Sequence, residues 1–218
     1  MRALAIVLMV IFHFIWDLNH FGYISVGIPN GPFWRELRVV IVTLFLFSMG
    51  VSLVYAYNKG IDNKKLLMRM AKLIVASGII TATTMVTSPK LWVYFGILHF
   101  IAFATIVCVW FVKKPNTSLV IGLVILGLYI FTDIPVKWPF IYIAEYLPKN
   151  TVDIVTILPW LSVPFIGVWA GHLAIFQAPA KKPVPKPIMA MSSNSLIIYL
   201  VHQPFFFACF YAYAWLMK

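Results

Sequence analysis

Long apolar runs, broken by short polar loops, constrain the fold of this chain more than any other feature. We identify seven such runs, each close to the roughly 20 residues that a helix needs to cross a bilayer. Of the 218 residues, 62% are hydrophobic and only 11% are charged, whereas a soluble domain is about half apolar and about a quarter charged. A water-soluble fold would have no surface for so many apolar side chains. The sequence therefore predicts an all-α fold, a polytopic membrane helix bundle.

The expected transmembrane helices follow the apolar runs. Their approximate bounds are 3–22, 37–57, 66–86, 91–112, 119–134, 154–175 and 193–217, with an error of about 2–4 residues at each end. The aromatic stretch 138–147 is amphipathic and is expected to lie in the membrane interface. The segment 177–187 (QAPAKKPVPKP) is too rich in proline for a helix, so we expect an extended cytoplasmic linker. No polar stretch is long enough for a second core, which predicts one domain over residues 1–218.

The formal net charge of +11 would suggest a nucleic-acid partner if it formed a stripe on a soluble face. Here the cations lie mainly in short loops, where they orient helices against the membrane, and no nucleic acid is expected. With seven spans, eleven of the 17 basic residues fall on the side of the amino terminus: Arg2, Lys59, Lys64, Lys65, Arg69, Lys72, Lys113, Lys114, Lys181, Lys182 and Lys186. The other side holds Arg35, Arg38, Lys90, Lys137, Lys149 and Lys218. This bias predicts a cell-membrane protein with a cytoplasmic amino terminus and an extracytoplasmic carboxyl terminus.

Ionisable residues inside apolar spans are costly and usually functional. His13 lies about ten residues from the cytoplasmic end of the first span, close to mid-bilayer at 1.5 Å per residue. Asp17 and His20 follow at i+4 and i+7 and share its face. A carboxylate one turn from an imidazole can accept its N–H, fix its tautomer and raise its basicity, as a general base requires. We favour this interpretation over a structural hydrogen-bonded pair that closes a helix interface.

Two further histidines are expected at the same depth. His99 lies in the fourth span and His202 in the last, and a residue count places both near the level of His13. Imidazoles on three helices at one level would outline a single polar cavity.

The last span carries other polar candidates on the same face. Ser195 and Tyr199 precede His202 at helical spacing. Pro204 has no amide hydrogen, so it leaves a backbone carbonyl one turn earlier free to bind a ligand, a water molecule or a side chain. The alternative is a plain proline kink filled by Gln203.

Several residues admit both a structural and a functional interpretation. Asp153 starts the sixth span and could cap it or contact a substrate. Gly167 and Gly171 form a GxxxG pattern that favours close helix packing. The small residues Ser48, Gly50 and Ser52 of the second span are expected to act likewise.

Arg69 and Lys72 reach into the third span and could hold the phosphates of a nucleotide-like donor, while the other cations of that loop face anionic lipid. Cys108 and Cys209 lie at different depths, which argues against a disulfide, and the two cysteines predict no metal site.

Five strings along the chain resemble a known family. They are RALAIVLMVIFHFIWDL (2–18), FLFSMGVSL (45–53), YFGILHFIA (94–102), D-x-x-x-I-L-P-W (153–160) and NSLIIYLVHQP (194–204). In this order they are similar to motifs of prokaryotic members of the heparan-alpha-glucosaminide N-acetyltransferase catalytic-domain family. The chain departs from these members in having Ala3 where a glycine is common, and in a loop 23–36 without the histidine that animal members use.

The resemblance implies a transmembrane acyltransferase. Its donor would be acetyl-CoA or another acyl-CoA from the cytosol, with no permanently bound cofactor, and its acceptor a sugar-type amine or hydroxyl across the membrane. The resemblance matches His13 to an essential first-helix histidine of the wider superfamily and Arg2 to the arginine ahead of that helix. His13, Asp17, His99 and His202 are therefore the expected catalytic residues. Candidate substrate or donor contacts are Arg2, His20, Arg69, Lys72, Asp153, Trp160, Ser195, Tyr199 and Gln203.

The sequence leaves alternatives open. Transfer could be direct or could pass through an acyl-histidine. The same histidines could instead supply two axial ligands to a haem, as in membrane cytochromes, and a carrier could use the polar cavity without reacting. An oligomer is compatible with the sequence.

Overall fold

The computed structural model describes residues 1–177 and 184–217 of the chain, and these are mostly helical, with no strand among them. The chain divides into two compact units. Unit 1 comprises Met1–Phe45 and Ala180–Lys218, and unit 2 comprises Leu46–Pro179. The long helix α2 (Pro32–Tyr57) contributes its first part to unit 1 and its second part to unit 2. The all-helical fold predicted from the apolar runs is confirmed.

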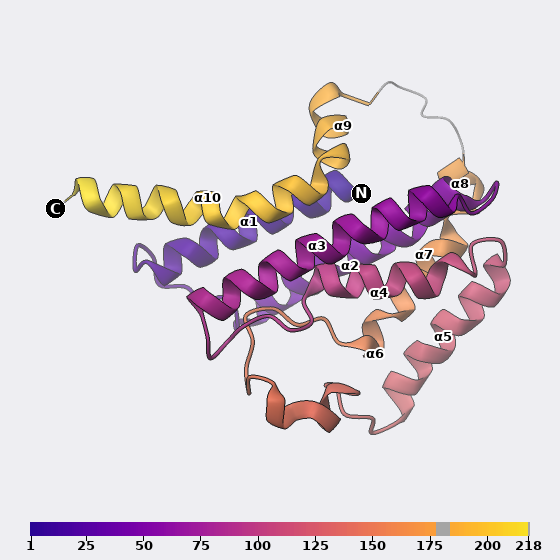
Figure 1. Cartoon of the computed structure of the whole chain (residues 1–218), viewed down its shortest axis with the longest axis horizontal. Helices are drawn as coiled ribbons and strands as arrows, with labels where there is room; N and C mark the ends of the chain where they lie inside the picture. The colour runs from indigo at the N-terminus through magenta and orange to yellow at the C-terminus, as the bar shows by residue number, and fades with distance from the viewer. Residues whose placement is uncertain (178–183, 218) are drawn as a thin grey trace. The chain divides into compact units, whose positions relative to one another are not determined.

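Unit 1 contains α1 (Arg2–His20), the start of α2, α9 (Lys186–Ser193) and α10 (Ser195–Leu216). Helices α1 and α10 lie side by side (Figure 1). Their ring contacts advance together along both helices, from His13 with His202 to Phe21 with Tyr211, so the two helices run parallel. Parallel first and last helices agree with the expectation that both spans cross the membrane in the same direction.

An apolar cluster holds α1 and α2 together in unit 1. Met9 and Phe12 lie one turn apart on α1, and they are buried against Ile28 and Ile41. Residues three or four apart share a face of a helix, so this spacing gives α1 a continuous apolar contact. Tyr199 of α10 packs against the same cluster.

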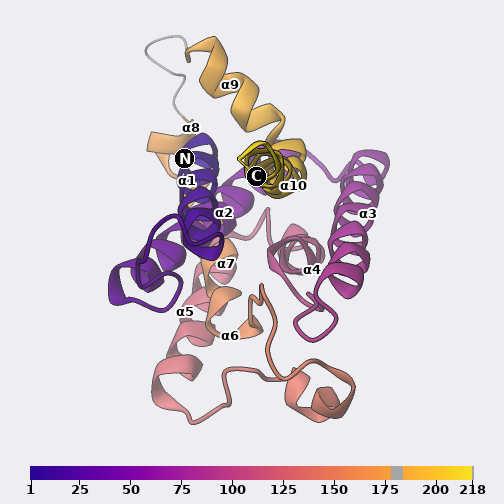
Figure 2. The same cartoon turned by 90° about the vertical axis from the view of Figure 1, so that its left-hand side faces the viewer.

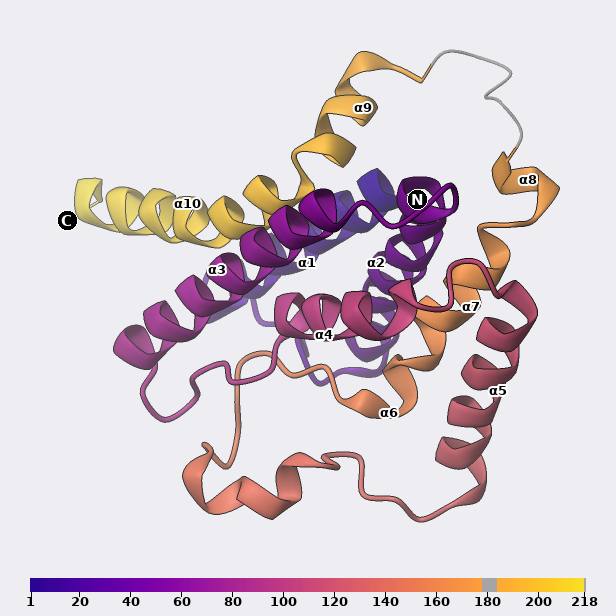
Figure 3. The same cartoon turned by 45° about the vertical axis from the view of Figure 1, so that its right-hand side comes forward.

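Unit 2 contains the remainder of α2 and a set of helices of unequal length: α3 (Asn63–Thr87), α4 (Ile97–Val109), α5 (Pro115–Phe131), α6 (Ile157–Trp160), α7 (Ser162–Ala170) and α8 (Ala174–Gln177), with the 3₁₀ helix η1 (Phe140–Tyr146). Helix α3 lies against α4 (Figure 2). Helix α5 packs along α7 (Figure 3).

Local sequence sets where these helices begin. Asp62 caps α3 by accepting a hydrogen bond from the backbone N–H of Lys65, 3.0 Å away. That hydrogen bond lowers the pKa of the Asp62 carboxyl, because it stabilises the charged form. Pro115 begins α5, where its missing N–H would have no partner in any case.

Four helices of the described residues are long and apolar enough to cross a membrane: α1, α2, α3 and α10. Helices α4 and α5 and the segment Ile157–Ala170 are apolar but shorter. These helices support a membrane protein, and the count of seven spans stays a prediction.

Two of the predicted spans are longer than the helices that the structure shows. The fourth was expected over 91–112, but α4 covers only Ile97–Val109. Residues 91–96 instead run extended beside residues 151–155, with a parallel bridge between Phe95 and Ile154.

The sixth span was expected as one helix over 154–175, and this expectation is wrong. Leu158 has extended backbone angles (φ −96°, ψ 133°), as a residue before a proline prefers. The chain breaks again between α7 and α8. The sequence is apolar enough for a span, but Pro159 prevents one uninterrupted helix.

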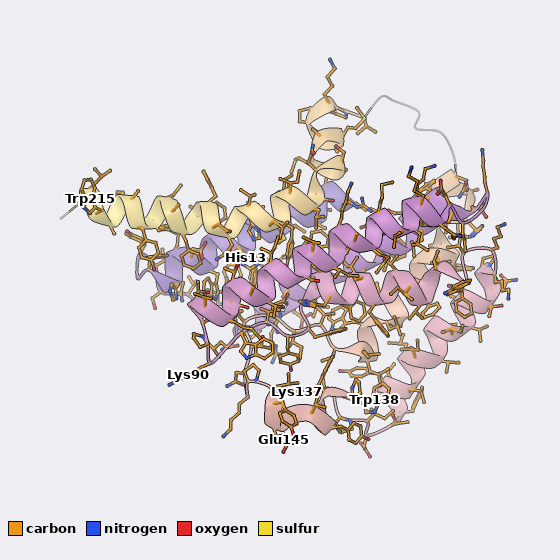
Figure 4. All side chains as sticks on the ribbon, in the orientation of Figure 1. His13, Lys90, Lys137, Trp138, Glu145 and Trp215 are labelled. Carbon is orange, nitrogen blue, oxygen red and sulfur yellow. The ribbon has the colours of Figure 1, made fainter. Side chains whose placement is uncertain are left out.

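The segments expected outside the bundle are described only in part. The aromatic stretch 138–147 contains η1, which has no buried residue. Figure 4 labels Glu145 of η1, and Lys137 and Trp138 just before it. The linker was expected over 177–187, but Gln177 belongs to α8 and α9 begins at Lys186. Residues 178–183, with Lys181 and Lys182, and the terminal Lys218 lie outside the described residues.

Glycines allow α2 and α7 to touch backbone to backbone in unit 2. A Cβ atom placed on Gly167 would lie 3.2 Å from the Cα of Gly50 and would press on the carbonyl oxygen of Phe47. A Cβ atom on Gly171 would lie 2.8 Å from a methyl carbon of Val54. The close packing expected of Gly50, Gly167 and Gly171 is confirmed.

We predict that Gly167→Ala lowers the free energy of unfolding by roughly 1–3 kcal/mol, because overpacking a tight contact forces the backbones apart. Thermal unfolding of the detergent-solubilised protein measures the loss. Gly78→Ala is the matched control: nothing lies within 4 Å of its Cβ position, and alanine favours a helix by about 1 kcal/mol over glycine. Equal melting temperatures for the two variants would contradict the contact.

Candidate functional site

Two histidine rings meet between α1 and α10 in unit 1. The ring centroids of His13, labelled in Figure 4, and His202 are 4.9 Å apart, and the rings meet edge to face at 62°. Both side chains are half-buried. The two rings therefore touch, as residues at one level of neighbouring helices do, and their depth in the membrane stays a prediction.

The hydrogen bond of His202 determines which of its nitrogens carries hydrogen. Nδ1 lies 2.7 Å from the carbonyl oxygen of Tyr199, one turn earlier on α10. A carbonyl oxygen only accepts, so Nδ1 is the donor and Nε2 presents its lone pair when the ring is neutral. Nε2 is buried and has no hydrogen-bond partner among the residues that the structure describes. His202 thus offers an unoccupied acceptor inside the protein.

We expected Asp17 to orient His13, but its hydrogen bond goes to another residue. Its side chain is fully buried, at 0% exposure, and Oδ1 accepts a hydrogen bond of 2.7 Å from Nε2 of Gln203 on α10. His13 meets its neighbours through ring contacts and forms no hydrogen bond within the described part of the chain. The amide of the neighbouring helix reaches the carboxylate instead, so Asp17 joins α1 to α10.

Within residues 1–177 and 184–217, three buried acceptor atoms have no donor: Oδ2 of Asp17, Nε2 of His202 and Oε1 of Gln203. All three belong to neighbouring positions on α1 and α10, since Gln203 is bonded to Asp17 and follows His202. Buried polar atoms in proteins are almost always paired, because leaving one unpaired costs about 1–3 kcal/mol. A set of unpaired acceptors therefore indicates a place for a ligand that carries N–H or O–H groups.

His20 does not join this group, although it shares a helix face with His13. Its ring is exposed and stacks on Trp16 at 5.0 Å, with the two planes only 8° apart. Phe21 and Phe207 complete this aromatic surface.

His99 lies in unit 2 and has its own polar environment. Its Nε2 is 3.1 Å from the hydroxyl of Thr81 on α3, and that hydroxyl donates to the carbonyl of Val93 at 2.8 Å. That the imidazole of His99 joins those of His13 and His202 in one cavity stays a prediction.

Asp153 caps a helix, but not the one that was expected. Its carboxylate accepts a hydrogen bond of 3.0 Å from the backbone N–H of Ile97, the first residue of α4. The paired segments 91–96 and 151–155 carry Asp153 to this place, through hydrogen bonds such as Val155 N–H to the carbonyl of Phe95 at 3.1 Å. Gly96 leaves the room, since a Cβ there would lie 3.2 Å from the Asp153 carboxyl carbon.

The remaining candidates occupy helix ends and exposed faces. Arg2 begins α1 and is half-buried. Arg69 and Lys72 are one turn apart on α3, the first half-buried and the second exposed. Trp160 ends α6, and Ser195 begins α10.

A family model described as heparan-alpha-glucosaminide N-acetyltransferase, catalytic, matches residues 1–204. The chain belongs to this family. No curated protein and no solved structure matches this chain.

Four of the five strings that resemble the N-acetyltransferase family meet one another in two pairs. The strings 2–18 and 194–204 contain the His13–His202 and Asp17–Gln203 contacts. The strings 94–102 and 153–160 are joined by Asp153. The family pattern therefore marks contacts between helices as well as candidate reacting groups.

Haem ligation does not fit the His13–His202 pair of this N-acetyltransferase family member. Two axial histidines lie on opposite faces of a porphyrin, but these two rings touch edge to face. The structure leaves no space between them for a macrocycle.

Sequence reasoning missed Thr81 and the pairing of Asp17 with Gln203. The pattern did contain a sign of the first: Ser77, Thr81 and Thr84 recur at i, i+4 and i+7 in an apolar helix, which marks a polar stripe. No such pattern identifies Gln203 as the partner of Asp17, because the two residues lie 186 positions apart.

We predict that Asp153→Ala destabilises the protein by about 1 kcal/mol, the usual loss when a helix cap is removed. Asp153→Asn keeps a side-chain oxygen for the Ile97 N–H and should lose less. Thermal unfolding in detergent measures both variants. If Asp153 serves only to contact substrate, both variants will unfold like the unmodified protein.

Proposed function

We propose that this chain is an integral membrane acyltransferase that transfers an acetyl group from acetyl-CoA to an amine or hydroxyl of a sugar-type acceptor. The family supports transfer of an acetyl group. The observation that carries the proposal is the set of three buried, unpaired acceptor atoms on Asp17, His202 and Gln203. An amine or hydroxyl acceptor supplies the N–H or O–H groups that these atoms lack.

In the proposed reaction His202 is the general base. The acceptor nitrogen or oxygen attacks the thioester carbonyl carbon as Nε2 of His202 takes its proton. The new bond to the acyl carbon forms and the carbon–sulfur bond breaks, and the His202 imidazolium gives its proton to the CoA thiolate that leaves, which restores the neutral imidazole. The Tyr199 carbonyl holds the Nδ1 hydrogen of His202 throughout, and this contact stabilises the imidazolium that forms. His13 lies against the same ring and completes the site.

The donor is proposed to approach from the cytoplasm, where the bias of Lys and Arg places the amino terminus. Arg69 and Lys72, one turn apart on α3, are proposed to bind its phosphates, as guanidinium and ammonium groups commonly do. The acceptor is proposed to enter from the opposite, extracytoplasmic side of the membrane.

We predict that purified protein transfers label from acetyl-labelled acetyl-CoA to an amino sugar, and that His202→Asn lowers kcat roughly 100- to 10,000-fold, the usual contribution of a general base. Asparagine can still donate to the Tyr199 carbonyl but has no atom in place of Nε2. A panel of amino sugars and neutral sugars, followed by mass spectrometry, identifies the acceptor.

His172→Gln is the matched control, because a glutamine amide can replace the histidine Nε2 that bonds the Val112 carbonyl at 2.7 Å. Its activity should equal that of the unmodified protein. Labelled acetyl-CoA that binds but stays intact with every acceptor would show a carrier, and a Soret band would show a haem protein. Full activity in a folded His202→Asn variant would reject His202 as the base.

A further inference from the structure

The hydroxyl of Thr81 determines the tautomer of His99 in unit 2. Three heavy atoms meet here: Oγ1 of Thr81, the carbonyl oxygen of Val93 at 2.8 Å, and Nε2 of His99 at 3.1 Å. The hydroxyl has one hydrogen, and the carbonyl can only accept. If the hydroxyl donated to the imidazole, two oxygen atoms 2.8 Å apart would face each other without a hydrogen between them.

The arrangement that satisfies all three atoms gives the hydroxyl hydrogen to Val93. Nε2 of His99 must then carry its own hydrogen and donate it to Thr81. In the neutral ring Nδ1 consequently holds a lone pair. Among the described residues no hydrogen bond engages Nδ1 of His99, and the side chain is half-buried.

Further hydrogen bonds hold the backbone on both sides of the Thr81–His99 contact. Val93 donates its backbone N–H to the hydroxyl of Thr84 at 3.0 Å, so both polar backbone groups of Val93 are bonded to α3. Asp153 holds the first turn of α4, two residues before His99. The ring of His99 therefore has one orientation in which Nε2 reaches Thr81.

We propose that Thr81 is a positioning residue that holds His99 with Nδ1 as an open hydrogen-bond acceptor, so that His99 binds an N–H or O–H group of a substrate. A neutral His99 held in this way cannot donate from Nδ1 to a developing oxyanion. Its part in the reaction is to orient a hydrogen-bond donor of the substrate, and this inference rests on the proposed acyl transfer. It would make His99 an acceptor of the same kind as His202, but with the opposite ring nitrogen open.

Nitrogen NMR of protein labelled at the histidine rings tests the tautomer without any assay of activity. The chain has five histidines, and the His99→Gln variant identifies the His99 signals by their loss. We expect a protonated Nε2 and an unprotonated Nδ1 for His99 in the unmodified protein. Thr81→Val should shift these signals, and Thr81→Ser should restore them. A hydrogen on Nδ1, alone or together with Nε2, would overturn the proposal.

Two substitutions at His99 then separate its two nitrogens. The side-chain oxygen of asparagine can occupy the place of Nδ1, whereas the amide nitrogen of glutamine can occupy the place of Nε2 and keep the bond to Thr81. We expect His99→Gln to raise KM for the acceptor tenfold or more, and His99→Asn to stay within a few-fold. An equal loss in both variants, or a greater loss in His99→Asn, would show a structural role and overturn the proposal.

These readouts also separate this inference from the proposed function. If the unmodified protein transfers no acetyl group, the proposed function fails, and the NMR signals still decide whether Thr81 fixes the tautomer. If transfer occurs but His99 carries its hydrogen on Nδ1, the acyltransferase stands and the role given to Thr81 is wrong. Thermal unfolding of each variant shows that the comparison is made on folded protein.

Discussion

The need to pair polar groups within hydrocarbon governs this structure. No water is available in a bilayer core, so each polar side chain on an apolar helix must find its partner in the protein. Asp17 is hydrogen-bonded to Gln203 on another helix, and His99 is hydrogen-bonded to Thr81. Asp153 finds the backbone of Ile97, 56 residues away in the sequence. These bonds are among the polar connections between segments of a mainly apolar fold.

Against this background the unpaired atoms of Asp17, His202 and Gln203 are informative. A fold that needed only to close the interface between α1 and α10 would be more stable with apolar side chains of similar volume at these positions. Buried acceptors without donors reduce stability, and a bound donor group restores what they lack. The cost in stability is therefore consistent with a binding site, as the family membership of the chain also suggests.

The apolar pattern predicted much of the fold and little of the site's pairing. Apolar runs long enough to span a membrane predicted helices α1, α2, α3 and α10. Small residues at helical spacing predicted the close helix packing at Gly50 and Gly167. The extended stretch 91–96 did not follow, because a pairing with residues 151–155 competes there with helix formation. We predicted that Asp17 pairs with His13 because the two residues are one turn apart. In the structure Gln203, on another helix, donates a hydrogen bond to Asp17 instead.

The tautomers of His99 and His202 are set by one means. In each ring a fixed oxygen, the Thr81 hydroxyl or the Tyr199 carbonyl, engages one nitrogen as a donor and leaves the other as an acceptor. A neutral imidazole held in this way can take a proton or orient a donor without first changing tautomer. No oxygen of the described residues is hydrogen-bonded to His13, and its ring contacts the ring of His202. That difference is the reason why we propose His202, and not His13, as the group that takes the proton.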